Sequence, residues 1–256
     1  MDTLAKKRRE RGEVNQTDIV PFLSLSKKQL LDLLNSPESV NRTCAAIALG
    51  DFKESAVVLR LCSQLSSEKK LYCKIAISDA LVNIGSLSVQ PLLMLLDKIG
   101  NNQETEIPRQ GFNKKSYPLP RDIVARTLCR IGPTILPDIF EFIVNAETPK
   151  RLEQAIDVLG HIVYTNKLTI DSELLLQIAS RHSELSMVQF KITRCFSGFT
   201  GHQVKQFLLK RLQSSHIGFQ YEAARSLVLS GLGLPNADCD LPQEVQTFAA
   251  QLKQSR

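Results

Sequence analysis

Two predicted helices between residues 69 and 100 constrain the fold more than any other part of the sequence. In the first helix, Ile77, Leu81 and Ile84 recur at i, i+4 and i+7, which places them on one face. Gly85 follows at the point where a left-handed residue would end that helix. The second helix carries its leucines on one face in the same way. Neither helix can bury its apolar stripe alone, so the pair requires neighbours of the same kind.

Similar helix pairs recur before and after this one. Their closing positions are Gly50, Gly85, Gly132, Val163, Gly201 and Gly231. The spacing is roughly 30–40 residues once the proline-rich interruption is removed, and a two-helix period in that range is typical of an α-solenoid. We therefore predict an all-α protein with a basic polar N-terminal arm at residues 1–23. Residues 24–256 are predicted to form the solenoid, with a long loop at 101–120.

The predicted helix that ends at Gly50 resembles the inner helix of the HEAT repeat, especially the short type of phycobilin-lyase-like proteins. The residues that carry the resemblance are Arg42, Ala45, Ala46, Ala48, Leu49 and Gly50. Weaker matches are Lys74 in the next repeat and Gln220, Ala223, Ala224 and Leu227 in the last. Residues 121–201 keep the helix pairs but depart from the motif. Over residues 26–256, the resemblance implies a right-handed α-solenoid of five to six HEAT-like helix pairs.

Composition and cysteine usage indicate an intracellular protein. The net charge is +6 and the pI is near 9.0, which is compatible with acidic partners and with nucleic acid. The six cysteines contain no CxxC pair, and their spacing fits neither a disulfide framework nor a zinc site, so we expect reduced core thiols and a cytoplasmic location. No secretory signal is predicted, and we expect no membrane partner because no apolar run approaches the ~20 residues of a membrane span.

Basic residues cluster in the long loop and in the helix that follows it. In that helix, Val124 and Leu128 belong to the buried face, whereas Arg126 and Arg130 lie opposite, together with Asp122. The HEAT resemblance implies that this helix is the inner one of its pair, so its arginines would face the concave surface. The alternative is a solvated helix face on which Asp122 pairs with Arg126.

The candidate binding residues combine this helix with the loop. They are Arg109, Lys114, Lys115, Tyr117, Arg121, Arg126 and Arg130. Arginines can clamp carboxylate or phosphate groups with two parallel hydrogen bonds, and Tyr117 would add an amphipathic contact. We expect a protein partner, acidic or phosphorylated, while nucleic acid binding by the same surface stays open.

Catalytic templates are absent from the sequence. It has no phosphate-binding loop, no nucleophile elbow and no His-Glu pairs of the kind found in HEAT-repeat deoxyhypusine hydroxylases, so we predict no metal and no cofactor. HEAT-like alkylpurine DNA glycosylases use Trp, and this chain has none. The sequence therefore favours a non-enzymatic adaptor or scaffold. The alternatives are a nucleic-acid-binding protein, including a glycosylase-like one, and a phycobilin-lyase-like chromophore-handling protein.

Overall fold

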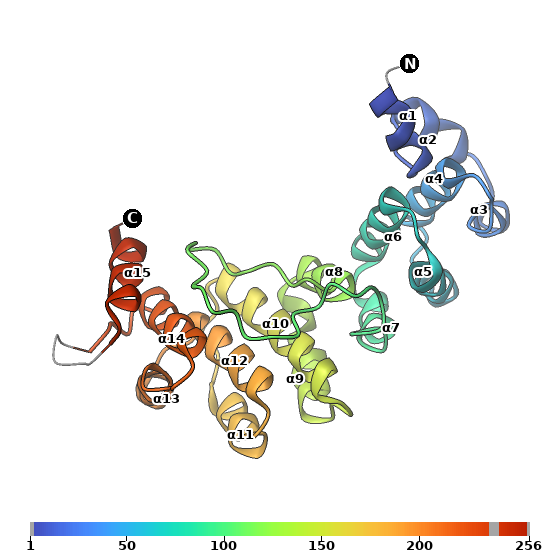
Figure 1. Ribbon diagram of the computed structural model, residues 1–256. Helices are drawn as coiled ribbons and strands as arrows, with labels where there is room; N and C mark the ends of the chain where they lie inside the picture. Colours follow the sequence, from blue (N-terminus) through green and yellow to red (C-terminus); the bar gives the residue numbers. More distant parts are fainter. Residues whose placement is uncertain (1–2, 236–240, 255–256) are drawn as a thin grey trace. The chain divides into compact units, whose positions relative to one another are not determined.

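The computed structural model describes residues 3–235 and 241–254, and every regular element in these residues is a helix (Figure 1). The chain forms two compact units. Unit 1 comprises Met1–Asn101 and Asp122–Asp138, and unit 2 comprises Asn102–Arg121 and Ile139–Arg256. Residues 102–121, which join two helices of unit 1 in sequence, thus belong to unit 2. The prediction of an all-α protein is confirmed for the described residues.

Unit 1 is built from helices that pair with their neighbours in sequence. Its helices are α1 (Thr3–Glu10), α2 (Gln16–Ile19), η1 (Val20–Phe22), α3 (Lys27–Leu33), α4 (Ser39–Leu49), α5 (Ser55–Ser67), α6 (Leu71–Ile84), η2 (Gly85–Ser88), α7 (Val89–Leu93), α8 (Ile123–Ile131) and η3 (Pro133–Ile135). Helix α4 packs on α6 and α6 on α8, and we call these three the inner layer of unit 1. Helices α3, α5 and α7 pair with α4, α6 and α8, respectively.

Small and branched residues explain the close packing of this layer. Ala45 and Ala46 of α4 are fully buried, as expected where two helix backbones approach closely. Leu81 of α6 is also fully buried, which confirms its predicted place in the core. Gly85 has a φ of 82° and ends α6 as predicted. Helix α7 is shorter than its apolar pattern predicts and ends at Leu93.

Part of the basic N-terminal segment packs against unit 1. Arg9 donates two hydrogen bonds to Asp18, at 2.8 and 2.7 Å, and Asp18 in turn closes a capping box with Asn15. The backbone N–H of Tyr72 in α6 donates to the carbonyl of Arg11 at 3.1 Å. These contacts hold the segment around Arg9 to Asp18 against unit 1.

Unit 2 repeats the same arrangement. Its helices are α10 (Pro149–Thr165), α11 (Glu173–Arg181), α12 (Ser186–Cys195), η4 (Phe196–Gly198), α13 (His202–Leu212), α14 (Ile217–Leu229) and α15 (Gln243–Gln254), and α9 (Leu136–Val144) crosses the division between the units. Helices α10, α12 and α14 stack in that order and form the inner layer of unit 2. Helix α11 packs on α12, and both α13 and α15 pack on α14.

The described cysteines lie in the core of the protein. The side chains of Cys44, Cys62, Cys73, Cys129 and Cys195 are buried, as predicted for core cysteines, and Cys239 lies outside the described residues. Burial raises the pKa of the Cys62 thiol to about 12, which makes it unreactive.

Among the described residues, Leu71–Leu93 is long and apolar enough to cross a membrane, but half of its most apolar part is buried in the protein. A core helix of a soluble protein meets the same criteria.

Candidate functional site

An extended segment at residues 102–121, here called the strap, covers the inner layer of unit 2. Figure 1 shows it crossing α10, α12 and α14 without regular secondary structure. Its three prolines favour extended backbone and lack N–H donors, which explains why it forms no helix. The predicted long loop is therefore confirmed as a loop, and side chains of the inner layer hold it in place.

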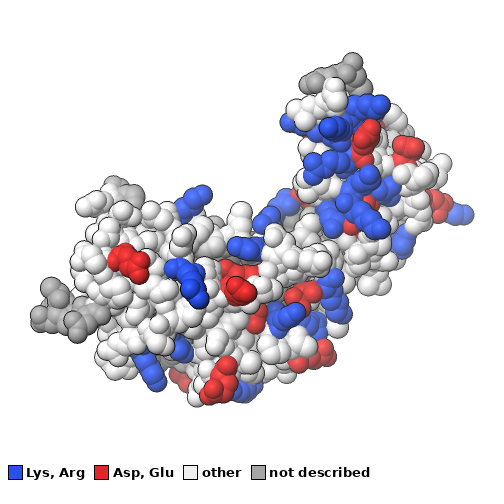
Figure 2. All heavy atoms as spheres, viewed as in Figure 1, with Lys and Arg blue, Asp and Glu red and all other residues white. Residues whose placement is uncertain are grey.

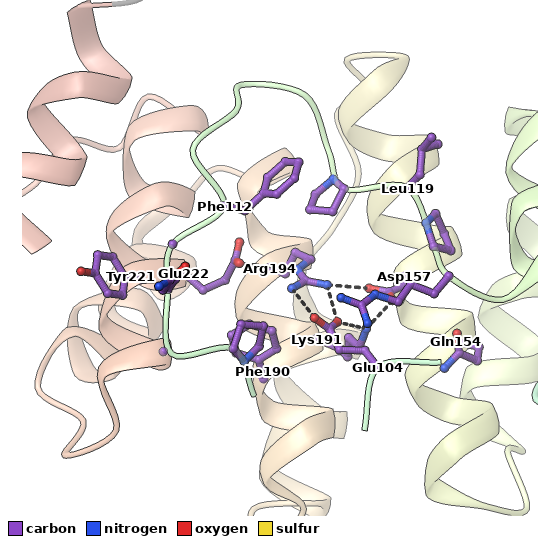
Figure 3. A pocket seen from close by; sticks show the side chains of 17 residues that line it. Glu104, Phe112, Leu119, Gln154, Asp157, Phe190, Lys191, Arg194, Tyr221 and Glu222 are labelled. Atoms are coloured by element: carbon purple, nitrogen blue, oxygen red, sulfur yellow. Dashed lines mark hydrogen bonds and ion pairs between the residues drawn. The ribbon is translucent and has the colours of Figure 1, made fainter. Parts of the chain in front are cut away.

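Two cations of α12 bind the carboxylate of Glu104 in the strap. Lys191 Nζ donates to Glu104 Oε2 at 2.7 Å and to Asp157 Oδ2 of α10 at 2.6 Å. Arg194 Nη1 donates to Glu104 Oε2 at 2.9 Å (Figure 3). Lys191 and Arg194 are only 2% and 6% exposed, so these ion pairs lie almost out of water. Glu104 thus bridges two buried cations.

The same series of charges continues into α14. Arg194 Nε lies 3.5 Å from Glu222 Oε2, and Arg225 Nη1 donates to Glu222 Oε1 at 3.0 Å. Arg225 Nη2 then donates to the backbone carbonyls of Ser116 at 2.6 Å and Lys114 at 3.2 Å. Arg225 is fully buried. The inner layer therefore binds the strap through a carboxylate near one end and through main-chain carbonyls near the other.

The charge network is balanced. Glu104, Asp157 and Glu222 supply three negative charges, and Lys191, Arg194 and Arg225 supply three positive ones. Burial alone would raise the pKa of Glu104, but the charges of Arg194 and Lys191 outweigh it and lower the pKa to about 2. In the opposite sense, burial would lower the pKa of Arg194, and the surrounding carboxylates raise it. The ion pairs of Glu104 and Arg194 therefore favour the charged forms of these two groups at neutral pH.

A repeat in the sequence underlies this network, and the sequence reasoning missed it. Asp157, Lys191 and Arg225 are 34 residues apart in each step, one on each helix of the inner layer. A 34-residue step is one two-helix repeat, so the three charges occupy equivalent positions. The available signal was a charged residue that recurs every 34 residues.

Aromatic and glycine residues complete the fit of the strap. Tyr117 is 4% exposed, and its ring occupies the space where a Cβ on Gly160 of α10 would lie. In the same way, the carbonyl of Pro108 approaches Gly218 at the start of α14 too closely to allow a side chain there. The inner layer therefore has glycine, with no side chain, at two points where the strap passes close to the helix backbone.

A cavity of about 400 Å³ lies between the strap and the inner layer (Figure 3). Phe112, Leu119 and Arg121 of the strap line it together with Phe190 of α12 and Tyr221 of α14. Because the buried charges beside it neutralise one another, the cavity offers a mixed surface and no excess of positive charge.

The structure distributes the seven predicted binding residues over both units. Arg109, Lys114, Lys115, Tyr117 and Arg121 belong to the strap and hence to unit 2, whereas Arg126 and Arg130 belong to α8 of unit 1. The side chains of Arg109, Lys114 and Arg121 are exposed, and that of Lys115 is half-buried. The expected role of Tyr117 as an exposed contact is wrong, because Gly160 lets its side chain pack against α10.

Asp122 also differs from its predicted place. It is the N-cap of α8 and is 1% exposed, and its carboxylate accepts hydrogen bonds from the backbone N–H groups of Val124 (2.7 Å), Ala125 (3.0 Å) and Asp97 (2.9 Å). It therefore does not share the exposed face of Arg126 and Arg130. Capping satisfied the free N–H groups of the helix and drew the side chain inward.

Cations also gather on the inner layer of unit 1. Arg42 of α4, Lys74 of α6 and Arg126 of α8 each stand four residues after the N-cap of their helix, so they occupy equivalent positions. Arg42 donates two hydrogen bonds to Glu68, at 2.8 and 3.0 Å. The side chain of Arg126 is exposed. Arg130 pairs with Asp79 of α6 at 2.6 Å, with both side chains about half exposed.

Exposed apolar residues and further lysines border these cations. Leu71 and Ile75, one turn apart on α6, are 42% and 43% exposed. Lys69 and Lys70, just before α6, are exposed as well. Figure 2 shows Lys and Arg gathered over the part of unit 1 that holds α1 and the start of α6. We define the basic face of unit 1 by the following residues: Lys69, Lys70, Leu71, Lys74, Ile75, Arg126 and Arg130.

Within the described residues, no group of three or more His, Cys, Asp or Glu side chains could hold a metal ion. His161 lies half-buried in α10.

Comparisons with known proteins give structural matches alone. No protein-family model matches the sequence, and no curated protein matches it. Three crystal structures of engineered proteins from the Northeast Structural Genomics Consortium are similar to the chain. The first has a TM-score of 0.39 and 17% identity and covers 96% of this chain and 72% of its own. The others have TM-scores of 0.36, with 15% and 18% identity over 82% and 89% of this chain, and 100% and 95% of their own. These matches assign neither a family nor a function to the chain.

Proposed function

We propose that the protein is a non-enzymatic cytoplasmic adaptor that binds an acidic segment of a partner protein on the basic face of unit 1. We also propose that its helix pairs form a right-handed solenoid of the HEAT type. The alternation of stacked and outer helices and the 34-residue step of the inner-layer charges support this fold.

The observation that carries the proposal is the strap itself. In unit 2, an inner layer of stacked helices binds an extended polypeptide through a carboxylate held by Lys191 and Arg194 and through carbonyls held by Arg225. Unit 1 has an inner layer of the same construction. Its basic face is exposed, so a segment of another protein can reach it.

The chemistry of the basic face selects the partner. Arg126 and Arg130 present exposed guanidinium groups that attract carboxylates, and Lys74 adds a third positive charge one helix away. Leu71 and Ile75 expose apolar surface beside these cations. A segment that combines Glu or Asp with Leu or Ile complements both features, and a preformed helical surface pays little ordering entropy on binding.

A fluorescence anisotropy titration tests the proposal. The probe is a labelled peptide of alternating Glu and Leu residues, titrated with wild type and with Arg126→Glu/Arg130→Gln. The Gln keeps a polar side chain with N–H donors at this half-exposed position, which limits any effect on folding. The matched control is Lys28→Glu/Lys53→Gln, which makes the same change in net charge at exposed positions away from the basic face.

We expect the site variant to bind the peptide about tenfold or more weakly than wild type, because a loss of 1.4 kcal/mol is a tenfold change in Kd. The control should bind as wild type does. Equal weakening in both variants would mean that only net charge matters and would contradict a defined site. A parallel titration with single-stranded DNA distinguishes the nucleic-acid alternative: DNA binding with a steep salt dependence, and no peptide binding, would replace the adaptor by a nucleic-acid-binding protein.

A further inference from the structure

We propose that the strap is the exchangeable occupant of a peptide-binding surface, and that the inner layer of unit 2 binds an extended acidic segment of another protein in its place. The strap is held by two kinds of contact that such a segment can also make. Lys191 and Arg194 bind the carboxylate of Glu104. Arg225 donates to main-chain carbonyls. These contacts recognise extended backbone and one acidic side chain, so they are not restricted to residues 102–121.

An ion pair joins adjacent inner helices in each unit, and the two pairs differ in exposure. In unit 1, Asp79 of α6 pairs with Arg130 of α8 at 2.6 Å, and the side chains are 49% and 52% exposed. In unit 2, Asp157 of α10 pairs with Lys191 of α12 at 2.6 Å, and the side chains are 5% and 2% exposed. The second pair lies beneath the strap, which contacts Lys191 directly. The strap therefore encloses charges of a kind that the inner layer of unit 1 holds in water.

Stability of the closed state does not account for these charges. Replacement of a buried ion pair by apolar residues of similar volume is often neutral or stabilising, because two charges must otherwise be taken out of water. A strap that never leaves can therefore rest on an apolar surface. Charged side chains suit a surface that is open to water for part of the time, because Asp157, Lys191 and Arg225 are solvated whenever the strap is away.

The strap is also longer than its connection requires. Connections between packed helices commonly take about 2–8 residues, and much longer segments without secondary structure are usually functional. Residues 102–121 form no helix, and a cavity of about 400 Å³ remains beneath them. Both ends of the strap continue into unit 1, so it stays tethered when it leaves the inner layer and can return. These features fit a segment that another polypeptide can replace.

The contacts of the strap define the partner segment. Glu104 supplies the carboxylate that Lys191 and Arg194 bind. Phe112, eight residues later, lies over the guanidinium of Arg225, with 5.2 Å between the ring centroid and Cζ. The partner is therefore an extended protein segment in which Glu or Asp is followed, eight residues later, by an aromatic residue.

Competition between the strap and a peptide tests the proposal. The probe is a fluorescently labelled peptide with the sequence of residues 102–117, titrated with the whole chain and followed by anisotropy. Wild type should bind it weakly, because the strap in place lowers the fraction of molecules that can bind. The chain variant Glu104→Gln should bind the same peptide about tenfold or more tightly, because its own strap competes less. Glu106→Gln, at an exposed position in the strap, is the matched control and should bind as wild type does.

Changes in the peptide should give the reciprocal result. A peptide with Gln in place of Glu104 should bind the Glu104→Gln chain about tenfold more weakly than the unchanged peptide does, and Ala in place of Phe112 should also weaken binding. A peptide with Gln in place of Glu106 should bind as the unchanged peptide does. Combining Glu104→Gln with Arg126→Glu/Arg130→Gln in the chain separates this surface from the basic face of unit 1. Loss of peptide binding in that combination would place the peptide on unit 1 and overturn the proposal.

Nuclear magnetic resonance of wild type gives a second measurement that does not depend on a destabilised variant. Excess unlabelled peptide, added to the isotope-labelled chain, should move the amide signals of residues 103–116 to positions typical of unstructured chain, while the signals of α12 stay dispersed. Equal affinity of the wild-type and Glu104→Gln chains for the peptide would overturn the proposal. Strap signals that do not move would overturn it too, because the strap would then be a permanent part of unit 2.

Discussion

Replacement of Glu104 by Gln is the sharpest test of how the strap is held. The substitution keeps the shape of the side chain but removes its charge, which leaves three buried cations facing two carboxylates. Lys191 keeps its contact with Asp157 at 2.6 Å, and Arg194 keeps weaker contacts with Glu222 at 3.5 Å and Asp157 at 3.9 Å. We expect Arg194 to be the less well compensated cation in the variant.

The pKa of Glu104 gives the magnitude. The pKa falls from 4.5 to about 2 on folding, and a shift of this size corresponds to about 3 kcal/mol of stability. Loss of one partner from a buried ion pair costs about 3–5 kcal/mol in other proteins, which agrees with the value derived from the pKa of Glu104. Because the folded pKa is the lower one, this stability is present above pH 4.5 and is lost as the pH falls toward 2. At pH 3 it should amount to about 1 kcal/mol.

Two assays follow from this reasoning. Urea unfolding at pH 7 should show Glu104→Gln to be about 3 kcal/mol less stable than wild type, and the difference should shrink to about 1 kcal/mol at pH 3. Trypsin at pH 7 should cut the variant faster at Arg109 and Lys114, which are exposed in the strap. Glu106→Gln, an exposed position in the same strap, is the control. A destabilisation below about 1 kcal/mol at pH 7, or one that does not change with pH, would refute the reasoning.

Three further predictions concern the core, the strap and the pH. Leu81→Ala should lower the free energy of unfolding by about 2–5 kcal/mol in urea melts, because Leu81 is fully buried in α6 and its truncation leaves a cavity; an unchanged melt would remove Leu81 from the core. Gly160→Ala should cost about 1–3 kcal/mol and speed tryptic cleavage of the strap, because the new Cβ overlaps Tyr117, and equal cleavage rates would contradict this fit. Burial lowers the pKa of His161, so stability should fall as the pH drops below about 6.5, and His161→Gln should flatten that dependence; the same slope in both proteins would assign it to another group.

The helix pairs could be predicted from the sequence because their signals are local. The spacing of Ile77 and Leu81 defines one face of α6, and Gly85, with a φ of 82°, ends that helix where the pattern stops. The exposure of Arg126 and Arg130 opposite Val124 follows from the same helical period. Such features depend on residues within a few turns of each other, so a single sequence contains enough information to place them.

The strap and its charge network depend on contacts that the linear sequence does not reveal. Glu104 and Arg194 are 90 residues apart, and Ser116 and Arg225 are 109 apart. Tyr117 lies in a predicted loop, and its burial depends on Gly160, which has no side chain and so leaves space for the tyrosine ring. The sequence by itself therefore determined which segments become helices and which faces they bury. Only the tertiary structure decided which charges neutralise one another, because ion pairing depends on separation in space, and packing of the repeats sets that separation.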